Sequence, residues 1–425
     1  MTDAGASALT QDIAKVRPQM ESATVVHDSD VWPNVLNGAP ESDGDTWPDR
    51  ILRCVTLTTV VAGFATPASW NHAPVAVILD VTVVVIILAE LVRRRPARQH
   101  PVVAATWGLA ASCYVGIKVT AWQLGGTQAA LADFVQAYKA YLFLIPLTWF
   151  IGKGSFTGAG LARTVRPLLF LTLAKYVVSY PLMSYRPAIW TENNFELMTV
   201  IGLTALAWPW LGKRRMGWII VLSVIVILSA SRCSILELVV VLLALYWRPN
   251  DRRFFVYSVL IATLGCVGTR VISARVHAGG GMAGLDRIKF WEVFLSESSR
   301  YSGRDWIFGT PPLTHLSYTS CDRLSYYRGL FSHSGAGDVC YSVVVHMFAL
   351  RAVMDQGVFG VTFLILFLWM ALRRSGASLR DRVAIIGIGV ANSLSVSGFN
   401  SEYMLIPLVV AMGLRRSRRV QPDVS

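Results

Sequence analysis

The chain has 425 residues, of which 54% are hydrophobic and only 15% are charged, and 14 of them are tryptophan. This composition is too apolar for an ordinary soluble domain and is typical of a protein that crosses a membrane several times. A net charge of +13 would suit a nucleic-acid partner if the protein were soluble. Here the basic residues stand in short clusters between apolar runs, as they do beside membrane spans. We therefore expect a lipid bilayer as a partner, and no nucleic acid.

The two ends of the chain differ in composition from the region between them. Residues 1–50 contain nine acidic side chains and no apolar run that could form the core of a signal peptide. They predict a disordered acidic cytoplasmic tail. Residues 415–425 predict a short basic cytoplasmic tail. No tandem repeat or low-complexity linker interrupts residues 51–414, so we expect a single transmembrane domain there.

A chain of this kind is expected to form many membrane-spanning helices. A span needs about 20 mostly apolar residues, or fewer where polar groups line a protein interior. The sequence predicts an all-α, polytopic membrane protein with about twelve such helices. The expected spans are 51–68, 74–92, 101–119, 134–152, 167–184, 196–212, 217–231, 234–247, 254–272, 343–372, 383–398 and 403–414.

Basic clusters after every second span predict the orientation of these helices. Arg93, Arg94 and Arg95 follow the second span, for example, and Lys213 and Arg214 follow the sixth. By the positive-inside rule the clusters lie on the cytoplasmic side, which places both termini there. The segment between the ninth and tenth spans, residues 273–342, is then one large extracytoplasmic loop.

The six cysteines show no metal-type spacing such as C-x-x-C, so a zinc or redox site is not expected. Cys321 and Cys340 both fall in the predicted outer loop, where a disulfide can persist. A disulfide and two free thiols are equally compatible with the sequence.

Several charged side chains fall within or beside the outer halves of the predicted spans. They are Asp80, Lys118, Lys139, Lys175, Glu237 and Arg270. Each would cost about 2.5 to 3.5 kcal/mol near the bilayer centre, so together they predict a protein-lined polar cavity that opens outward. Its excess of cations suits an anionic, amphiphilic ligand. Structural ion pairs explain these residues equally well. The candidate pairs are Asp80 with Lys118, and Glu237 with Arg232 or Lys175.

A first motif is the turn Ser231-Arg232-Cys233-Ser234 between two apolar runs. A guanidinium held at such a turn offers a planar fork for phosphate oxygens at the level of lipid headgroups. An arginine near the end of a span can also simply extend to the membrane interface.

A second motif is Arg287-Ile-Lys289-Phe-Trp291, followed by Gly309. Helical spacing places Arg287 and Trp291 on one face. A cation beside an aromatic ring suits a sugar or a lipid headgroup, although tryptophan is equally common as an interfacial anchor.

The third motif begins at His346 and continues through Leu350, Gly357 and Gly360 into a long apolar run. An imidazole at the mouth of a membrane helix could take a proton from an acceptor hydroxyl near neutral pH. Taken alone, His346 would more simply be a hydrogen-bonded residue at a helix start. The glycines permit close backbone packing.

Together these stretches resemble the O-antigen ligase and polysaccharide polymerase superfamily of bacterial membrane glycosyltransferases. The resemblance covers most of residues 134–414. It rests on the Ser231-Arg232 turn, Arg287-x-x-x-Trp291 with Gly309, the large outer loop, and His346 with Leu350, Gly357 and Gly360. The chain departs from the family at Met347, where asparagine or serine is common, and over residues 315–345, which have no evident counterpart.

The resemblance implies a GT-C-like fold in the bacterial cytoplasmic (inner) membrane. It also implies transfer of a glycan from a polyprenyl (undecaprenyl-type) pyrophosphate carrier to an acceptor hydroxyl on the outer face, with inversion and without a metal or cofactor. In this scheme His346 is the base, and Arg232 and Arg287 neutralise the pyrophosphate. Further candidate contacts to the donor are Arg270, Lys139, Lys175 and Arg351. Candidate contacts to the acceptor or glycan are Trp291, His333 and Asp338.

Two other activities fit the same composition. A transporter or flippase of lipid-linked saccharide would show paired broken helices with ionisable groups reached from both sides. A peptidoglycan-type glycan polymerase would consume lipid-linked muropeptide. The sequence does not distinguish a ligase from a polymerase, because the acceptor has no recognisable signal.

Overall fold

The computed structural model describes residues 44–64, 75–92, 101–125, 129–182, 188–189, 193–246, parts of 258–273, 286–332 and 339–416. These residues are helical and contain no strand, apart from isolated bridges between Phe156 and Leu414 and between His315 and Tyr341. The prediction of an all-α fold is therefore confirmed for the described part of the chain. The predicted tails, residues 1–50 and 415–425, lie largely outside it.

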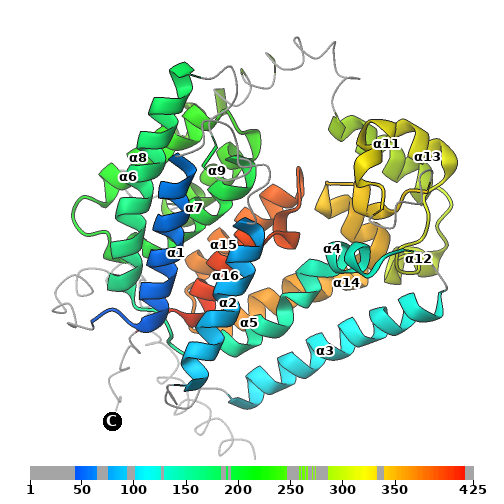
Figure 1. Ribbon diagram of the computed structural model, residues 1–425, viewed down its shortest axis with the longest axis horizontal. Coiled ribbons are helices and arrows are strands. Elements are labelled where there is room, and N and C mark those ends of the chain that lie inside the picture. Colours follow the sequence, from blue (N-terminus) through cyan, green and yellow to red (C-terminus); the bar gives the residue numbers. More distant parts are fainter. Residues whose placement is uncertain are drawn as a thin grey trace, which may run out of the picture. The chain divides into compact units, whose positions relative to one another are not determined.

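Helices cover most of the predicted apolar segments, with ends that differ by up to nine residues from the predicted ones (Figure 1). Their bounds are α1 (Trp47–Phe64), α2 (Val75–Val92), α3 (Pro101–Leu124), α4 (Leu131–Leu142), α5 (Leu144–Phe150), α6 (Gly158–Leu182), α7 (Asn193–Ala207), η3 (Trp208–Trp210), α8 (Arg215–Ser229), α9 (Arg232–Tyr246), α11 (Asp286–Ser298), α12 (Gly303–Phe308), α13 (Tyr318–Arg323), η5 (Ser325–Leu330), η6 (Ser342–Val344), α14 (Phe348–Arg374), α15 (Leu379–Ser393), η7 (Gly398–Asn400) and α16 (Glu402–Gly413).

Three of these helices are long and apolar enough to cross a membrane. They are α2, α3 and α14, and two shorter helices, α8 and α16, are also apolar. The predicted span 254–272 lies mostly outside the described residues. The total of twelve spans and the orientation of the chain remain predictions.

The main core forms where α15 packs against α7 and α9, and where α16 packs against α7 and α2. Close approach of α7 and α16 depends on Gly202, since a Cβ atom there would lie 2.8 Å from the side chain of Pro407. The contact between α15 and α9 is part of this core. It brings the end of α15 beside the turn that precedes α9.

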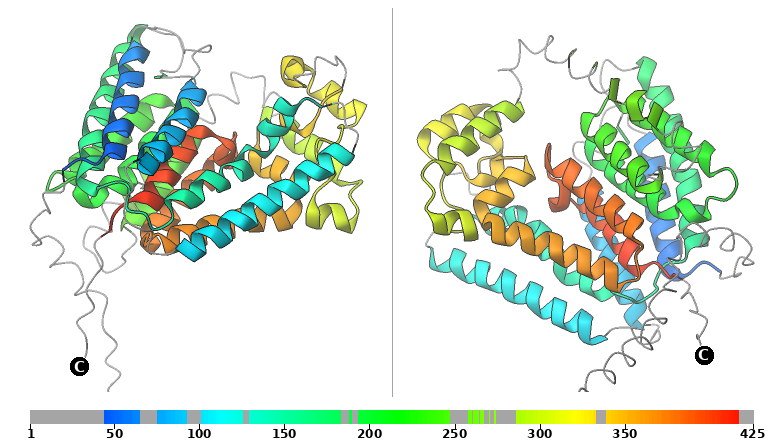
Figure 2. Two further views of the ribbon diagram at one scale, coloured as in Figure 1. Left: turned by 60° about the horizontal axis from the view of Figure 1, so that its bottom comes forward. Right: turned by 180° about the vertical axis from the view of Figure 1, so that it is seen from behind.

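A second, smaller core lies in the segment that the sequence assigned to the large loop. We call residues 286–332 and 339–347 the loop region. Its buried side chains come from α11, α13 and the residues around η6, and Phe290, Val293 and Leu324 are among them. The loop region gathers at the start of α14, as Figure 2 shows. Cys321 and Cys340 form a disulfide inside this core. Of the two alternatives that the sequence left open, the structure has the disulfide and not two free thiols.

The long helix α14 is interrupted at Gly357, where φ is 64° and ψ is −176°. The break lets the chain before it pack directly on the end of α12. Thr310 N donates to Met354 O (2.8 Å), and Lys118 Nζ donates to the carbonyl oxygens of Phe308 and Asp355 (3.0 Å each). Other parts of the protein therefore donate hydrogen bonds to the backbone carbonyl groups beside the break.

Glu297 fastens α11 to the start of α13. Its carboxylate accepts hydrogen bonds from Ser317 and Ser320. Burial alone would raise the pKa of Glu297, but these hydrogen bonds and the charge of Arg300 outweigh it, so the pKa lies below its usual value. The carboxylate is thus ionised in the folded loop region at neutral pH.

Replacing Glu297 by glutamine should therefore weaken the loop region in a pH-dependent way. A lowered pKa in the folded state stabilises it above the unfolded pKa, near 4.3, and this contribution is lost as pH falls through the folded value. We expect Glu297→Gln to reduce hydrogen-exchange protection of α13 at pH 7 by about 1 to 2 kcal/mol, with the difference shrinking below about pH 4. Glu292→Gln, an exposed position on the same helix, is the control. Equal protection of the Glu297 variant and wild type at pH 7 would contradict this account.

Candidate functional site

Two arginines from distant parts of the sequence meet at the start of α9. Arg232 is the first residue of α9 and Arg287 the second of α11. Arg287 Nη2 donates to Cys233 Sγ (3.8 Å), which places its guanidinium beside Arg232, and the two positive charges act on each other. The Nε atoms of both arginines are buried and have no hydrogen-bond partner among the described residues. Like charges held together with unused donors form a site suited to an anion.

The turn that carries Arg232 is built from small polar residues, as the sequence predicted. The helix α8 ends at Ser229, and Ala230 adopts a left-handed conformation with φ of 49°. Ser231 Oγ donates to Asn194 Oδ1 (2.5 Å) and accepts from Ser234 N (3.3 Å). Ser231 therefore caps the first turn of α9 and ties it to α7.

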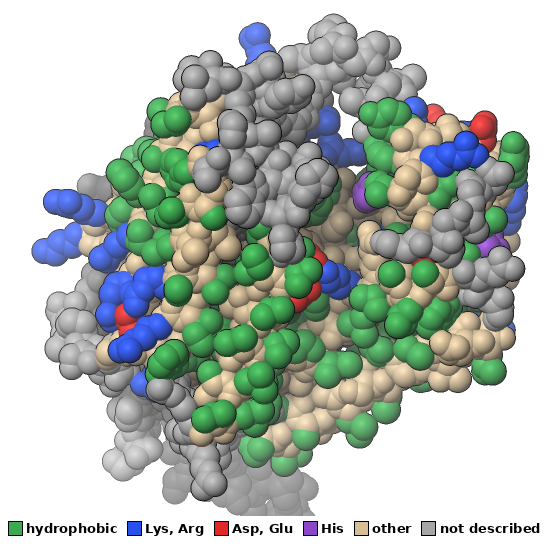
Figure 3. Space-filling model, viewed as in Figure 1, with side chains coloured by type: hydrophobic (Ala, Val, Ile, Leu, Met, Phe, Trp, Pro, Cys, Tyr) green, Lys and Arg blue, Asp and Glu red, His purple; other side chains and the backbone are tan. Residues whose placement is uncertain are grey.

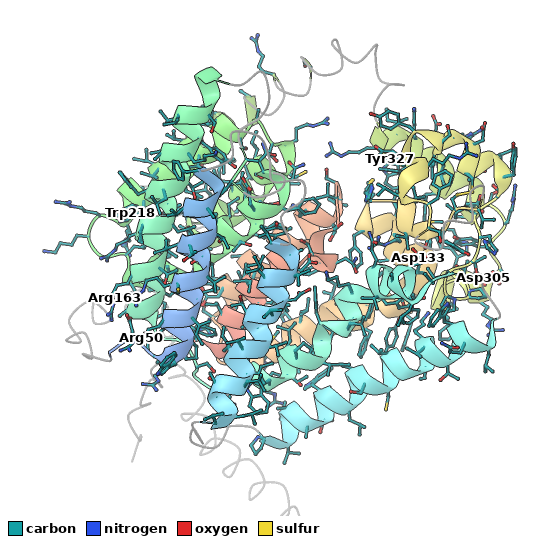
Figure 4. All side chains as sticks on the ribbon, viewed as in Figure 1. Arg50, Asp133, Arg163, Trp218, Asp305 and Tyr327 are labelled. Carbon is teal, nitrogen blue, oxygen red and sulfur yellow. A yellow bond between two sulfur atoms is a disulfide. The ribbon has the colours of Figure 1, made fainter. Side chains whose placement is uncertain are left out.

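His346 lies between η6 and the first residue of α14 and is partly buried. Its ring packs edge-on against Phe290, with ring centroids 6.3 Å apart, and against Tyr327, at 5.7 Å. Figure 4 labels Tyr327 within the loop region. Phe348 N donates to Val396 O (3.0 Å), which holds the start of α14 against the end of α15.

The helix α11 connects these two groups. Arg287, which contacts Cys233, and Phe290, which contacts His346, stand three residues apart on α11 and so share a face. One face of α11 thus links the three residues that the sequence singled out most strongly, Arg232, Arg287 and His346. Figure 3 shows Lys or Arg side chains and a histidine bordering a hollow in the surface.

Trp291 stands beside this face of α11. It is 44% exposed and packs edge-on against Phe294, with ring centroids 5.8 Å apart. An exposed indole next to a cationic group keeps both of the predicted uses open, a sugar face or a lipid headgroup.

Two of the predicted cationic contacts are engaged in the protein interior. Lys139 Nζ forms ion pairs with Asp80 (3.5 Å) and Glu402. Lys175 Nζ donates to Gly63 O (2.8 Å). These contacts support the structural interpretation of both lysines, because each ammonium group already has a partner.

The predicted ion pairs themselves were wrong. Asp80 pairs with Lys139 rather than with Lys118, because Lys118 donates instead to Phe308 O at the end of α12 and to Asp355 O beside the break in α14. Glu237 accepts a hydrogen bond from Asn392 Nδ2 (2.7 Å) and pairs with neither Arg232 nor Lys175 in the described structure. Sequence spacing could not show these partners, since they lie on helices distant along the chain.

Arg351 is buried within α14, and its Nε and Nη2 atoms have no hydrogen-bond partner among the described residues. Its charge interacts with that of Asp355, one turn further along, and its guanidinium lies 5.6 Å from the Phe348 ring centroid. No contact with Arg232 or Arg287 is present in the described structure.

The remaining predicted residues are exposed or lie outside the described part of the chain. Arg270 is exposed. His333 and Asp338 fall in residues 333–338, outside the described part. Within the described residues, no group of three His, Cys, Asp or Glu side chains is placed to hold a metal ion.

Sequence reasoning missed Phe290, Tyr327 and Asn392, which contact or position the predicted residues. Phe290 lies inside the second motif, so its place next to Arg287 was an available signal. Asn392 is a neutral amide near the end of a mainly apolar helix, and nothing in its sequence surroundings marked it as functional. No protein-family model, curated protein or solved structure matches the chain.

Proposed function

We propose that this protein transfers a glycan from a polyprenyl (undecaprenyl-type) pyrophosphate carrier to an acceptor hydroxyl on the outer face of the bacterial cytoplasmic membrane. It would act as an O-antigen ligase or a cell-surface polysaccharide polymerase. The observation that carries the proposal is the face of α11, which joins an arginine pair with unused donors to His346.

The arrangement supplies what this reaction needs. Two guanidinium groups can bind the pyrophosphate and stabilise the charge that develops as the bond from the anomeric carbon to the phosphate oxygen breaks. His346 can accept the proton of the acceptor hydroxyl as its oxygen bonds to the anomeric carbon. The polyprenyl diphosphate leaves with the bonding electrons. Attack from the face opposite the leaving group inverts the anomeric centre.

The membrane helices and the exposed aromatic residue fit the two ends of such a donor. Helices long and apolar enough to cross a bilayer would give the polyprenyl chain access from lipid. Trp291, one turn from Arg287, presents an exposed ring on which a sugar attached to the pyrophosphate can stack.

The arginine pair provides the test. We expect Arg232→Ala and Arg287→Ala each to lower kcat/KM for an undecaprenyl-pyrophosphate-linked glycan by about 10-fold or more in proteoliposomes, mainly through a higher donor KM, because each removes a charge-assisted contact. Lysine at either position should restore part of the loss, since it keeps the charge without the fork. Arg323→Ala, an exposed cation of the loop region, is the control.

Other outcomes would overturn the proposal. If both alanine variants kept the wild-type donor KM, the arginine pair would not be part of the donor site. Movement of the saccharide across the bilayer with no new glycosidic bond would favour a flippase, a class in which a broken helix such as α14 is common. Consumption of lipid-linked muropeptide alone would favour a peptidoglycan-type polymerase.

A further inference from the structure

Asn392, near the end of α15, is a buried side chain whose amide nitrogen and carbonyl oxygen are both hydrogen-bonded. Its Nδ2 donates to Glu237 Oε1 (2.7 Å) on α9 and to Asn194 O (3.1 Å) on α7. Its Oδ1 accepts from Gly398 N (3.2 Å) in η7. One amide thus joins three other elements in the protein interior, where unmade hydrogen bonds are costly.

One branch of this network leads to the arginine turn. Asn194, whose backbone carbonyl accepts from Asn392, uses its side-chain oxygen to accept from Ser231 Oγ (2.5 Å). Ser231 directly precedes Arg232 and caps the helix that Arg232 begins. The position of Arg232 therefore depends on a residue that Asn392 holds.

The other branch leads to His346. The backbone carbonyl of Asn392 accepts from Val396 N (2.9 Å), and Val396 O accepts from Phe348 N (3.0 Å). Phe348 follows His346 by two residues and begins α14. Hydrogen bonds and short chain segments thus connect the residue before Arg232 with the segment that carries His346.

We propose that Asn392 is a positioning residue that sets the spacing between the arginine pair and His346. This inference rests on the proposed function, because it assigns the arginine pair and His346 to one reaction. Glu237 accepts the hydrogen bond that orients the side-chain amide of Asn392. It is a buried carboxyl group with no cationic partner in the described structure, which suits it to pair with a neutral amide. A shift of about 1 Å between reacting groups can cost about 100-fold in rate, so the spacing has a measurable consequence.

The test compares Asn392→Leu with Thr199→Val in the full chain. Thr199, on α7, donates from Oγ1 to Tyr403 O (2.6 Å) on α16, a buried hydrogen bond that leads to neither end of the site. We expect Asn392→Leu to lower kcat by about 10- to 100-fold with donor KM near wild type, because both arginines remain. Thr199→Val should keep kcat. Glu237→Gln, which retains a carbonyl oxygen for Asn392, should be active, and Glu237→Leu should resemble Asn392→Leu.

A distance measurement separates positioning from loss of folded protein. Spin labels at Leu236→Cys on α9 and Tyr326→Cys in η5, both exposed positions, report the spacing in a background without the exposed cysteines. Asn392→Leu should broaden or shift the distance distribution, and Thr199→Val should not. An unchanged distribution in Asn392→Leu, or equal losses in both variants, would overturn the proposal. If wild type transferred no glycan, the proposed function would fail, while the distances would still decide whether Asn392 sets the spacing.

Discussion

Replacing His346 by alanine should lower kcat for glycan transfer by about 100- to 10,000-fold, the usual contribution of a general base. Donor KM should change little, because Arg232 and Arg287 remain in place. The base must be neutral to accept a proton, so the wild-type rate should fall as the pH drops below the range in which an imidazole titrates. His346→Gln keeps a polar side chain but accepts no proton in this range, and its residual rate should lack that acidic limb.

The control for His346 is His315→Gln, which changes an exposed histidine of the same loop region that stacks on Tyr341. It should keep both the rate and the pH profile of wild type. If His346→Gln kept the acidic limb and lost donor affinity instead, His346 would be a ligand of the diphosphate. Full activity of a folded His346→Ala variant would remove it from the mechanism.

Replacing Gly357 by alanine should have the largest effect on stability, at least about 3 kcal/mol. Its φ of 64° and ψ of −176° fall in a region that essentially only glycine occupies. An added Cβ atom would also lie 2.3 Å from Ile307 O and 2.5 Å from Gly309 N. These are backbone atoms that cannot turn away as a side chain could. We expect a marked drop in the monodisperse fraction and in the thermal midpoint of the detergent-solubilised protein.

Gly309 is the other side of the same contact. Its φ is 80°, and a Cβ atom there would lie 2.4 Å from the carbonyl carbon of Asp355, so Gly309→Ala should be destabilised in the same way. Gly116→Ala is the matched control on α3, since nothing lies within 4 Å of its added Cβ atom. Wild-type stability of Gly357→Ala would mean that α14 is not broken there.

The positions of the helices could be predicted from the sequence because the signal is local. The runs 74–92 and 101–119 are apolar enough to be recognised without knowledge of their neighbours, and the structure has α2 (Val75–Val92) and α3 (Pro101–Leu124) there. The turn at Arg232 and the position of His346 just before a helix could also be predicted from the sequence, since caps and turns depend on adjacent residues. The sequence by itself therefore determined the helical class and the main candidate residues.

Only the tertiary structure decided which of these residues meet. Asp80 pairs with Lys139, and Glu237 with Asn392, because helix packing, and not sequence spacing, selects their partners. The same packing places α11 between Cys233 and His346, which joins the arginine pair to the histidine. It also gives Asn392 its central position. A neutral amide has no long-range signal in a sequence, since its role arises from three hydrogen bonds that exist only after the helices have packed.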